Sequence, residues 1–387
     1  MQESGGSEIP DDLPKFNIIE YDPIFYMSEI ITVPSINNDN NFELKMIGEG
    51  SYAKVFRYRD EFYNKFFVLK RAKNDLNDKE LERFKREFDV MNELKKRGYE
   101  GIGSDLAPEY AGVQDGSAVT TMPYVPLDIT DKEAVEKVLT ECRPDVVIHC
   151  AAWTAVDLAE DEDKMGKVRA INAGGTENIA KVCKKLDCKM VYISTDYVFD
   201  GQGTEPWQPD CTAYKPLNVY GQTKLEGEQA VSSNLERYFI VRIAWVFGVN
   251  GKNFIKTMLN VAKTHDTLKV VNDQIGTPTY TYDLARLLVD MIETDKYGYY
   301  HATNEGGYIS WYDFTKEIFR QAVEMGRIEY AEDAVKVLPV TTEEYGVSKA
   351  KRPFNSRLDK KKLVENGFTP LPTWQDALKR YLKEIEF

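Results

Sequence analysis

Histidine and usefully spaced cysteine are scarce in this sequence of 387 residues. It has 3 histidines, too few for a histidine-rich metal site, and 5 cysteines, an odd number that cannot pair completely. Cys183 and Cys188 are too far apart in the sequence for a CxxC motif. We therefore expect no metal site and no disulfide framework. All the cysteines are interpreted as reduced thiols of a cytoplasmic protein: Cys142, Cys150, Cys183, Cys188 and Cys211.

The sequence also lacks a long apolar run and an excess of positive charge. No segment approaches the roughly 18 consecutive apolar residues of a membrane span, and Met1–Pro10 contains no apolar signal core. Lys and Arg total 50 and Asp and Glu total 63, which gives a net charge of −13. Such a chain repels nucleic acid and anionic membranes over its general surface. The composition therefore predicts neither as a partner, and an anionic ligand must be held by a local site.

The first part of the chain differs from the rest. Residues 1–40 are polar and contain turn-forming residues, which predicts a flexible leader. Residues 41–94 combine short alternating runs with a charged amphipathic stretch, which predicts a small antiparallel β-plus-helix segment. The runs are Phe42–Ile47, Lys54–Tyr58 and Phe66–Leu69, and the helical stretch is Asn77–Arg97.

After Gly98, short apolar runs alternate with helical patterns. This alternation indicates βαβ units and a parallel sheet. We therefore predict that residues 89–387 form an α/β domain with a doubly wound, Rossmann-like parallel sheet and a smaller C-terminal substrate region. The expected strands are 101–104, 122–127, 146–150, 190–194, 239–247, 268–271 and 299–302. The expected helices are 131–141, 165–186, 218–235, 254–264, 281–293 and 311–325.

Tyr220 and Lys224 form a Tyr-x-x-x-Lys motif within an expected helix. Residues i and i+4 share a helix face, so the phenol and the ammonium group should lie side by side. A nearby cation favours phenolate, and we expect Lys224 to lower the pKa of Tyr220. Such a tyrosine can donate a proton to a carbonyl oxygen while hydride arrives at the carbon. The spacing alone is weak, because it occurs by chance in many helices.

Thr195 strengthens this interpretation. It ends the apolar run Met190–Thr195, and ligands of doubly wound sheets bind outside the carboxyl ends of the strands. Its hydroxyl could therefore hydrogen-bond the same substrate carbonyl as Tyr220. A strand-end hydroxyl that only caps a turn is the alternative.

Longer segments around these residues resemble a known family. Ser194-Thr-Asp-Tyr-Val-Phe-Asp-Gly201 and Tyr220-Gly-Gln-Thr-Lys-Leu-Glu-Gly-Glu228 are similar to the extended short-chain dehydrogenases, and within them to the dTDP-4-dehydrorhamnose reductases. Further similar segments are Leu127–Asp131, His149–Asp157, Asn172–Asn178, Arg242–Gly248 and Gln274–Thr279. The resemblance implies an oxidoreductase that uses NADPH or NADH. Its reaction would reduce the C4 keto group of dTDP-4-dehydro-6-deoxy-L-mannose to give dTDP-L-rhamnose.

The resemblance also implies roles for individual residues. The sequence leaves the oligomeric state open, with a homodimer as one candidate. The catalytic set would be Thr195, Tyr220 and Lys224. The cofactor would be bound by Asp105, Asp128, Ile129, Ala151, Ala152, Thr154, Asn172, Tyr220 and Lys224. The dTDP-sugar would be faced by Asp196, Val198, Trp245, Gln274 and Thr279. Asp105 takes the ribose-reading position, where an acid suits a free 2′-hydroxyl and opposes a 2′-phosphate.

One departure from the family concerns the start of the domain. The family opens with a strand and a turn of the type Gly-x-x-Gly-x-x-Gly, which brings the cofactor pyrophosphate to a helix N-terminus. No such turn precedes Asp89. The reductase-like domain is therefore expected to lack its first strand and its glycine turn.

The preceding segment instead resembles the N-terminal lobe of a protein kinase. The resemblance rests on the glycine-containing run Ile47–Phe56, on Lys70 and on Glu87. No His-Arg-Asp loop and no Asp-Phe-Gly segment follows, so the machinery for phosphoryl transfer is missing. Residues 41–94 are thus expected to be a truncated, inactive kinase-like segment.

Three functions remain open from the sequence. The first is an active reductase. The second is a non-catalytic dTDP-sugar-binding protein, or a chimeric chain with an incomplete dinucleotide site. The third is an inactive kinase-like nucleotide-binding module. The missing glycine turn separates the first two, and the missing kinase metal ligands weaken the third.

Overall fold

The computed structural model describes residues 97, 99–106, 123–249, 252–346 and 348–385, together with the backbone of four earlier strands. The chain divides into two compact units, Met1–Pro126 and Leu127–Phe387. The residues expected to act on the sugar all belong to the second unit.

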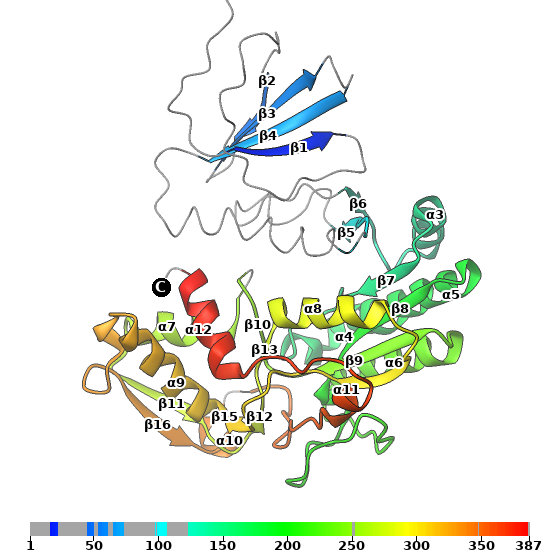
Figure 1. Cartoon of the computed structure of the whole chain (residues 1–387). Coiled ribbons are helices and arrows are strands. Elements are labelled where there is room, and N and C mark those ends of the chain that lie inside the picture. The colour runs from blue at the N-terminus through cyan, green and yellow to red at the C-terminus, as the bar shows by residue number, and fades with distance from the viewer. Residues whose placement is uncertain are drawn as a thin grey trace, which may run out of the picture. The chain divides into compact units, whose positions relative to one another are not determined.

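The first unit contains two sheets (Figure 1). The antiparallel sheet has the order β1-β4-β3-β2, with β1 at Phe16–Tyr21, β2 at Lys45–Glu49, β3 at Ala53–Asp60 and β4 at Lys65–Ala72. The antiparallel strands expected after residue 41 are therefore present. β1 lies within the segment expected to be a leader, and the helix expected at 77–97 lies outside the described residues except for Arg97. The second sheet is a parallel pair, β5 at Gly103–Asp105 and β6 at Tyr124–Pro126.

The second unit is built on a parallel four-stranded sheet of order β14-β9-β8-β7. The strands are β7 at Val146–His149, β8 at Lys189–Thr195, β9 at Tyr238–Ile243 and β14 at Gly298–His301. Met190, Val191 and Tyr192 are consecutive and completely buried. Because successive side chains of a strand point to opposite faces, both faces of β8 are covered. The predicted α/β fold with a parallel sheet is confirmed.

The absence of a first strand in the sequence has a counterpart in the sheet order. In the common doubly wound order 3-2-1-4-5-6, the first strand lies between the second and the fourth. Here the pair β5-β6 and the sheet β14-β9-β8-β7 are separate, and no strand of the described residues joins them. β7 therefore pairs with β8 alone among the described strands. Ile148 in the middle of β7 is 38% exposed, although it is apolar.

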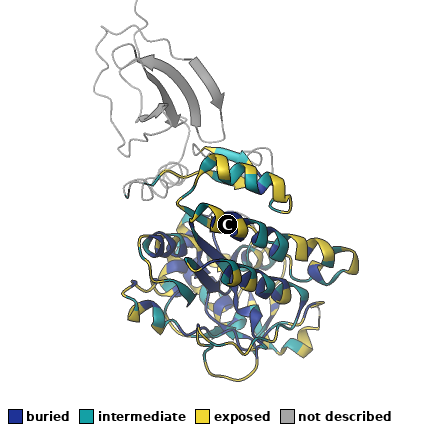
Figure 2. Ribbon diagram, turned by 90° about the vertical axis from the view of Figure 1, so that its right-hand side faces the viewer, coloured by how far each residue is buried: buried dark blue, intermediate teal, exposed yellow. Residues whose placement is uncertain are grey.

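Helices cover this sheet and form the first core of the second unit. They are α3 at Lys132–Cys142, α4 at Glu162–Arg169, the π-helical η2 at Ala170–Gly175, α5 at Thr176–Leu186, α6 at Val219–Asn234 and α8 at Thr281–Ile292. Apolar side chains of α3, α5 and α6 pack with those of β8 and β9 in one buried cluster. Figure 2 shows the buried residues on the strands and on the inner helix faces.

A second core belongs to the C-terminal region. The strand pairs are β10 (Val246–Phe247) with β13 (Thr279–Tyr280), β11 (Thr267–Val271) with β16 (Lys336–Val340), and β12 (Ile275–Gly276) with β15 (Ile309–Ser310). The helices are α7 at Phe254–Ala262, α9 at Trp311–Glu324, α10 at Thr342–Tyr345, α11 at Lys361–Glu365 and α12 at Trp374–Glu384. Single turns lie at Leu158–Glu160, Asp196–Val198 and Ile328–Tyr330.

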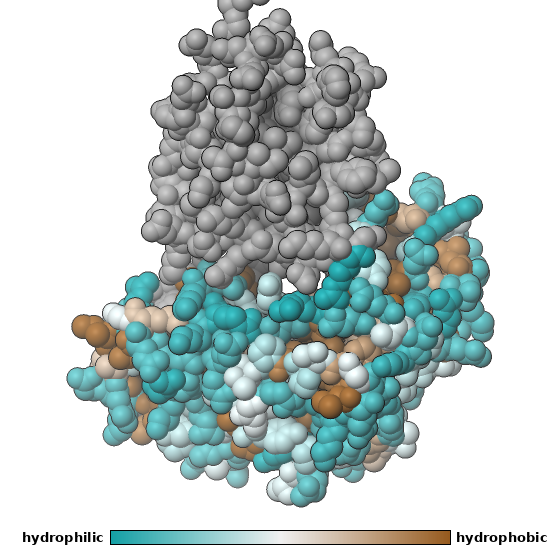
Figure 3. Space-filling model, viewed as in Figure 1, coloured by the Kyte–Doolittle hydropathy of each residue, from teal (hydrophilic) through white to brown (hydrophobic). Residues whose placement is uncertain are grey.

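Apolar residues of α7, α9 and α12 pack around β11 and β13 in this core. The face of the second unit seen in Figure 3 is correspondingly mostly hydrophilic, with small hydrophobic patches. Among the described residues, no helix is long and apolar enough to cross a membrane.

Candidate active site

The N-terminus of α6 carries Tyr220 and Lys224. Asn218 caps the helix, because its side chain accepts a hydrogen bond from the backbone N–H of Gly221 at 2.8 Å. A side chain at position 221 would collide with the carbonyl oxygen of Tyr197, so only glycine allows the helix to approach so closely. The cap and the glycine together fix the first turn of α6 next to the end of β8.

Lys224 is buried and points toward β8. Its Nζ donates a hydrogen bond to the carbonyl oxygen of Ile193 at 2.7 Å and lies 4.0 Å from the ring centroid of Tyr192. Burial lowers the pKa of Lys224 to about 7, although the charges of Glu228 and Cys150 oppose this shift. Without a ligand, the ammonium group is therefore held by a carbonyl and an aromatic face.

Tyr220 has a less acidic phenol than the sequence predicts. Burial raises the pKa of Tyr220 to about 12, a hydrogen bond with the Thr195 side chain lowers it, and the charge of Asp196 raises it. The expectation that Lys224 lowers the pKa of Tyr220 is wrong, because burial outweighs other effects and Lys224 is not among the groups that shift this pKa. Sharing a helix face brought the two residues near each other, but the Nζ of Lys224 bonds to Ile193. The lowered pKa of Lys224 also means that part of the Lys224 population is uncharged near neutral pH.

Thr195 lies where the sequence predicts, at the end of β8, and it is 5% exposed. Its hydroxyl donates to Oδ1 of Asp196 at 3.1 Å and accepts from the backbone N–H of Tyr197 at 3.3 Å. The latter bond caps the turn Asp196–Val198, so the turn-capping alternative describes part of its role. Thr195 also lowers the pKa of Tyr220, so the two expected reacting hydroxyls lie close enough to influence each other.

Asn172 connects α6 to the segment after β7. It is completely buried in the π-helical η2, a type of distortion that is frequent at functional sites. Its Oδ1 accepts from the backbone N–H of Trp153 at 2.8 Å, and its Nδ2 donates to the hydroxyl of Thr223 at 3.1 Å. Asn172 thus supports the helix turn that carries Lys224, and its expected contact with the cofactor stays a prediction.

A buried layer beneath Lys224 was not foreseen from the sequence. Nε2 of His149 lies 3.0 Å from the hydroxyl of Thr176, and the His149 ring stacks on Tyr192 at a centroid distance of 5.7 Å. Burial lowers the pKa of His149 to about 3, and the charge of Lys224 adds to this effect. A side chain at position 227 would collide with the hydroxyl of Tyr192, so Gly227 lets α6 lie on this layer.

A buried ion pair also holds α6 against the sheet. Nε and Nη2 of Arg242 in β9 donate to the two carboxylate oxygens of Glu228 in α6 at 2.8 and 2.7 Å. Ser194 donates to Glu228 at 2.6 Å, and Arg242 also donates to the hydroxyl of Tyr214 at 3.0 Å. The charges of Arg242 and Glu228 in the motif segments therefore have a structural role, because they pair with each other in the core.

The residues expected at the adenosine end lie in both units. Asp105 belongs to the first unit, is exposed, and accepts a hydrogen bond from the backbone N–H of Leu106 at 2.6 Å. Asp128 is exposed in the second unit. Its carboxylate accepts from the Thr130 hydroxyl and backbone N–H at 2.7 and 2.9 Å, and these bonds lower the pKa of Asp128. Ile129 is partly buried and lies against Gly175.

The segment after β7 presents small side chains. Ala151 and Thr154 are exposed, and Ala152 is partly buried. Small residues at the carboxyl end of a strand leave the backbone open to a ligand. The expected contact of this segment with a dinucleotide stays a prediction, with which its small side chains are compatible.

The five residues expected to face the sugar nucleotide differ in exposure. Trp245 is partly exposed, has a left-handed backbone (φ of 50°) and stacks on Trp311 with ring centroids 3.7 Å apart. Its unusual backbone divides the single strand expected at 239–247 into β9 and β10. Gln274 is buried, and its Nε2 donates to the hydroxyl of Thr342 at 3.0 Å.

The other three are buried and already engaged. Val198 is completely buried in a cluster with Phe199 and Leu225. Thr279 is completely buried and donates to the carbonyl oxygen of Ala244 at 2.6 Å. Asp196 is 2% exposed. Neither Val198 nor Thr279 presents an accessible surface to a ligand in this structure, because both side chains complete the packing around β8 and β10.

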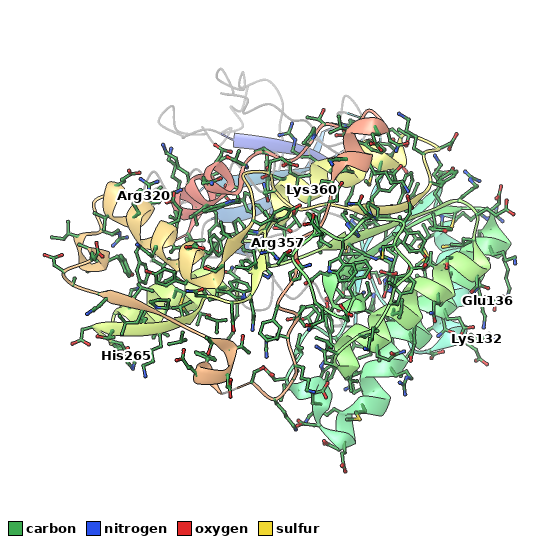
Figure 4. The ribbon with its side chains drawn as sticks, turned by 90° about the horizontal axis from the view of Figure 1, so that it is seen from below. Lys132, Glu136, His265, Arg320, Arg357 and Lys360 are labelled. Atoms are coloured by element: carbon green, nitrogen blue, oxygen red, sulfur yellow. The ribbon has the colours of Figure 1, made fainter. Side chains whose placement is uncertain are left out.

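A basic segment from the C-terminal region approaches the same end of the sheet. Asp157 accepts hydrogen bonds from the backbone N–H groups of Lys349 and Ala350 at 3.1 and 3.0 Å. It also forms an ion pair with Arg352 at 2.7 Å. The continuation of this segment carries Arg357 and Lys360, which lie near the middle of the view in Figure 4. No sequence motif indicated these contacts.

The chain matches a known protein family over most of its length. The family model described as the RmlD substrate binding domain matches residues 97–387. The chain belongs to this family. Its match begins after the kinase-like segment, and the relatives below are reductases, so the kinase resemblance of residues 41–94 finds no support.

Named relatives agree with this family. The chain is 39% identical to dTDP-4-dehydrorhamnose reductase of Escherichia coli K12 over 264 residues, which are 67% of this chain and 85% of that protein. A dTDP-4-dehydrorhamnose reductase of Bacillus anthracis, solved in complex with NADP, is 38% identical to this chain with a TM-score of 0.63. The match covers 73% of this chain and 99% of the Bacillus anthracis chain. The dTDP-4-dehydrorhamnose reductase of Clostridium acetobutylicum is 41% identical to this chain with a TM-score of 0.63. This match covers 73% of this chain and 97% of the Clostridium acetobutylicum chain.

Proposed function

We propose that the chain reduces the C4 keto group of dTDP-4-dehydro-6-deoxy-L-mannose to give dTDP-L-rhamnose, with NADPH or NADH. The observation that carries the proposal is the meeting of Thr195, Tyr220 and Lys224 at the carboxyl end of β8. The family match and the names of the relatives support the same substrate and reaction.

The residues of the second unit fit the nicotinamide half of a dinucleotide. The open segment Ala151–Thr154 would lie along the cofactor, and Lys224 would turn from Ile193 to the ribose hydroxyls. Asp128 and Ile129 would flank the adenine, and Asp105 would read its ribose. When bound, the reduced nicotinamide supplies the hydride.

The chain's own part of the reaction is proton transfer and orientation. Tyr220, whose raised pKa keeps its phenol protonated at neutral pH, can donate its proton to the C4 oxygen of the sugar. Thr195 can hydrogen-bond the same oxygen and orient it. A Lys224 ammonium moved next to Tyr220 would favour the phenolate that remains. We expect Trp245 and Gln274, which stack on Trp311 and bond to Thr342 respectively, to contact the sugar nucleotide.

The diphosphate end is proposed to bind weakly. In related folds, backbone N–H groups of the glycine turn and of a helix N-terminus hold the pyrophosphate. The sequence offers no such turn before Asp89. Loss of two or three charge-assisted hydrogen bonds, at about 1.5–3 kcal/mol each, weakens binding by several orders of magnitude.

A graft tests the function. Residues 1–88 are replaced with a strand and a Gly-x-x-Gly-x-x-Gly turn, and the oxidation of NADPH is followed with dTDP-4-dehydro-6-deoxy-L-mannose. We expect the repaired chain to reduce the sugar far faster than the unaltered chain. The same graft with Tyr220→Phe is the control. A repaired chain that binds NADPH but leaves the keto sugar unreduced would contradict the proposed reaction.

A non-catalytic dTDP-sugar-binding protein is the second candidate. The missing turn favours it. The graft separates the two candidates when the unaltered chain is assayed beside it. Reduction by the unaltered chain at a measurable rate identifies an enzyme. Sugar binding without any reduction identifies a binding protein that the graft converts into an enzyme.

Two further features belong to the same proposal. A cytoplasmic location is supported by the free cysteines of the described residues and the net charge of −13. A homodimer is the candidate assembly. Sedimentation velocity tests it, and a single species with the mass of one chain would contradict it.

A further inference from the structure

Asp196 is a buried carboxyl group directly beside the reacting residues. It follows Thr195 at the end of β8 and is 2% exposed. Its Oδ1 accepts a hydrogen bond from the Thr195 hydroxyl at 3.1 Å, and its Oδ2 accepts one from the Ser356 hydroxyl at 2.5 Å. Both carboxylate oxygens are thus engaged by hydroxyl groups of the chain itself.

The surroundings of Asp196 disfavour its charge. Among the described residues, no basic side chain forms an ion pair with it. Burial raises the pKa of Asp196 to about 6, although the bonds from Ser356 and Thr195 lower it. The titratable groups near it are the phenols of Tyr197, in the same turn, and Tyr220, in α6. Arg352 and Asp157 act in turn on Tyr197.

The bond to Asp196 occupies the only proton of Thr195. A hydroxyl group has one donor and two acceptor positions. While Thr195 donates to Asp196, it can only accept, as it does from the backbone of Tyr197. To donate to a sugar oxygen, Thr195 must release Asp196. A hydrogen bond to an ionised carboxylate is about twice as strong as one between neutral groups, so the charge of Asp196 governs this release.

Ser356 connects the same carboxyl group to the C-terminal region. Its backbone N–H donates to the carbonyl oxygen of Ile275 at 2.8 Å. Ile275 lies in β12, within the Gln274–Thr279 segment that is expected to face the sugar nucleotide. A ligand that moves this segment would therefore change a hydrogen bond to Asp196.

We propose that Asp196 is a positioning residue that directs the Thr195 hydroxyl, and that Ser356 tunes it. The ionised carboxylate retains the proton of Thr195, and the neutral carboxyl group lets Thr195 donate it to the sugar oxygen. The proposal rests on the proposed function, because the sugar nucleotide is the ligand that Thr195 serves.

Titration of the carboxyl group tests the tuning without turnover. Carboxyl-carbon NMR of the whole chain, labelled in aspartate, follows Asp196, and Asp196→Asn identifies its resonance. Ser356→Ala removes one hydrogen bond and is expected to raise the pKa of Asp196 by about half a unit to one unit. Ser233→Ala, which removes an exposed hydroxyl from α6, is the control and should change nothing. An unchanged titration in Ser356→Ala would overturn the proposal.

Binding of dTDP-L-rhamnose tests the effect on the ligand. Calorimetric isotherms from pH 5 to 8 should show about two- to tenfold weaker binding above the pKa of Asp196. Asp196→Asn should lose this step but keep a separate step near pH 7 from Lys224. A step near pH 6 that survives in Asp196→Asn contradicts the proposal.

Ser356→Ala provides a second variant if Asp196→Asn does not fold. Its binding step should move to higher pH together with the NMR titration, and a step that stays in place overturns the proposal. Failure of the proposed function is distinguishable, because it appears as a lack of sugar reduction by the repaired chain and not in these titrations.

Discussion

The reacting end and the diphosphate end of the expected cofactor site are encoded differently. We define the reacting end as Thr195, Tyr220 and Lys224, and the diphosphate end as the start of the first βα unit near residue 89. The reacting end depends on side chains of β8 and α6, which the second unit holds with many buried contacts. The diphosphate end depends on the backbone of a glycine turn that the sequence lacks.

Because the two ends depend on different segments, a chain can lose the diphosphate end and keep the reacting end. The buried partners of the reacting end, such as Glu228 and Asn172, all belong to residues 127–387. Replacing the segment before residue 89 removes none of these partners from the chain.

The largest stability effect is expected at the scaffold of the reacting end. Glu228→Gln leaves Arg242 buried without its counter-charge, which typically costs about 3–5 kcal/mol. Urea unfolding of the second unit, followed by tryptophan fluorescence, measures the free energy of unfolding. Glu136→Gln removes an exposed ion pair with Lys185 and should cost at most about 1 kcal/mol. Equal effects of the two substitutions would contradict the role of the buried pair.

The next effect concerns the rate of reduction. Tyr220→Phe in the repaired chain should lower kcat by about 100-fold or more, since general acid catalysis is typically worth 10²–10⁴. The affinity for dTDP-L-rhamnose should change little. Tyr282→Phe alters an exposed phenol on α8 and should keep the full rate. Near-normal reduction by Tyr220→Phe would remove Tyr220 from the reacting end.

The smallest effect is a pH dependence of stability from Lys224. Its folded pKa of about 7 lies below its ordinary value of 10.5, so between these values the unfolded chain binds more protons. Below pH 7, Lys224 is protonated in both states, and the full free-energy cost of burying its charge lowers the stability of the fold. Above pH 7 this cost decreases, so the stability of the fold rises with pH. The stability gain of Lys224→Met over the original chain should shrink above pH 7 by up to about 1.4 kcal/mol per pH unit.

The exposed Lys185 provides the control for this measurement. Lys185→Met removes a surface ion pair with Glu136, and its effect on stability should stay constant between pH 7 and 9. Urea unfolding at several pH values measures both substitutions. A difference between Lys224→Met and the original chain that does not vary with pH would show that Lys224 titrates normally.

Sequence periodicity was sufficient for the parts of the site that depend on one element. The helix spacing of Tyr220 and Lys224 and the position of Thr195 at a strand end followed from local patterns, and the structure has them so. The strand expected at 239–247 was too long, because the left-handed backbone of Trp245 has no local sequence signal. The π-helical η2 within the expected helix 165–186 was missed for the same reason.

Contacts between segments that lie far apart in the chain could not be predicted from the sequence. The direction of the Lys224 side chain depends on a carbonyl group of β8, which helix spacing alone does not place. Ser356 reaches Asp196 across 160 positions of the chain, and Arg352 reaches Asp157 across 195. Such pairs require the packed tertiary structure, and they are the ones that set the charges in the site.

The most direct test of separate loss of the two ends is a pair of calorimetric isotherms on the unaltered chain. In one isotherm the chain is titrated with NADPH, and the titration is repeated with NADH. In the other it is titrated with dTDP-L-rhamnose. The same titrations of the repaired chain give the reference affinities. The account predicts dTDP-L-rhamnose binding within about tenfold of the reference and dinucleotide binding weaker by several orders of magnitude. Micromolar binding of NADPH or NADH by the unaltered chain would contradict it.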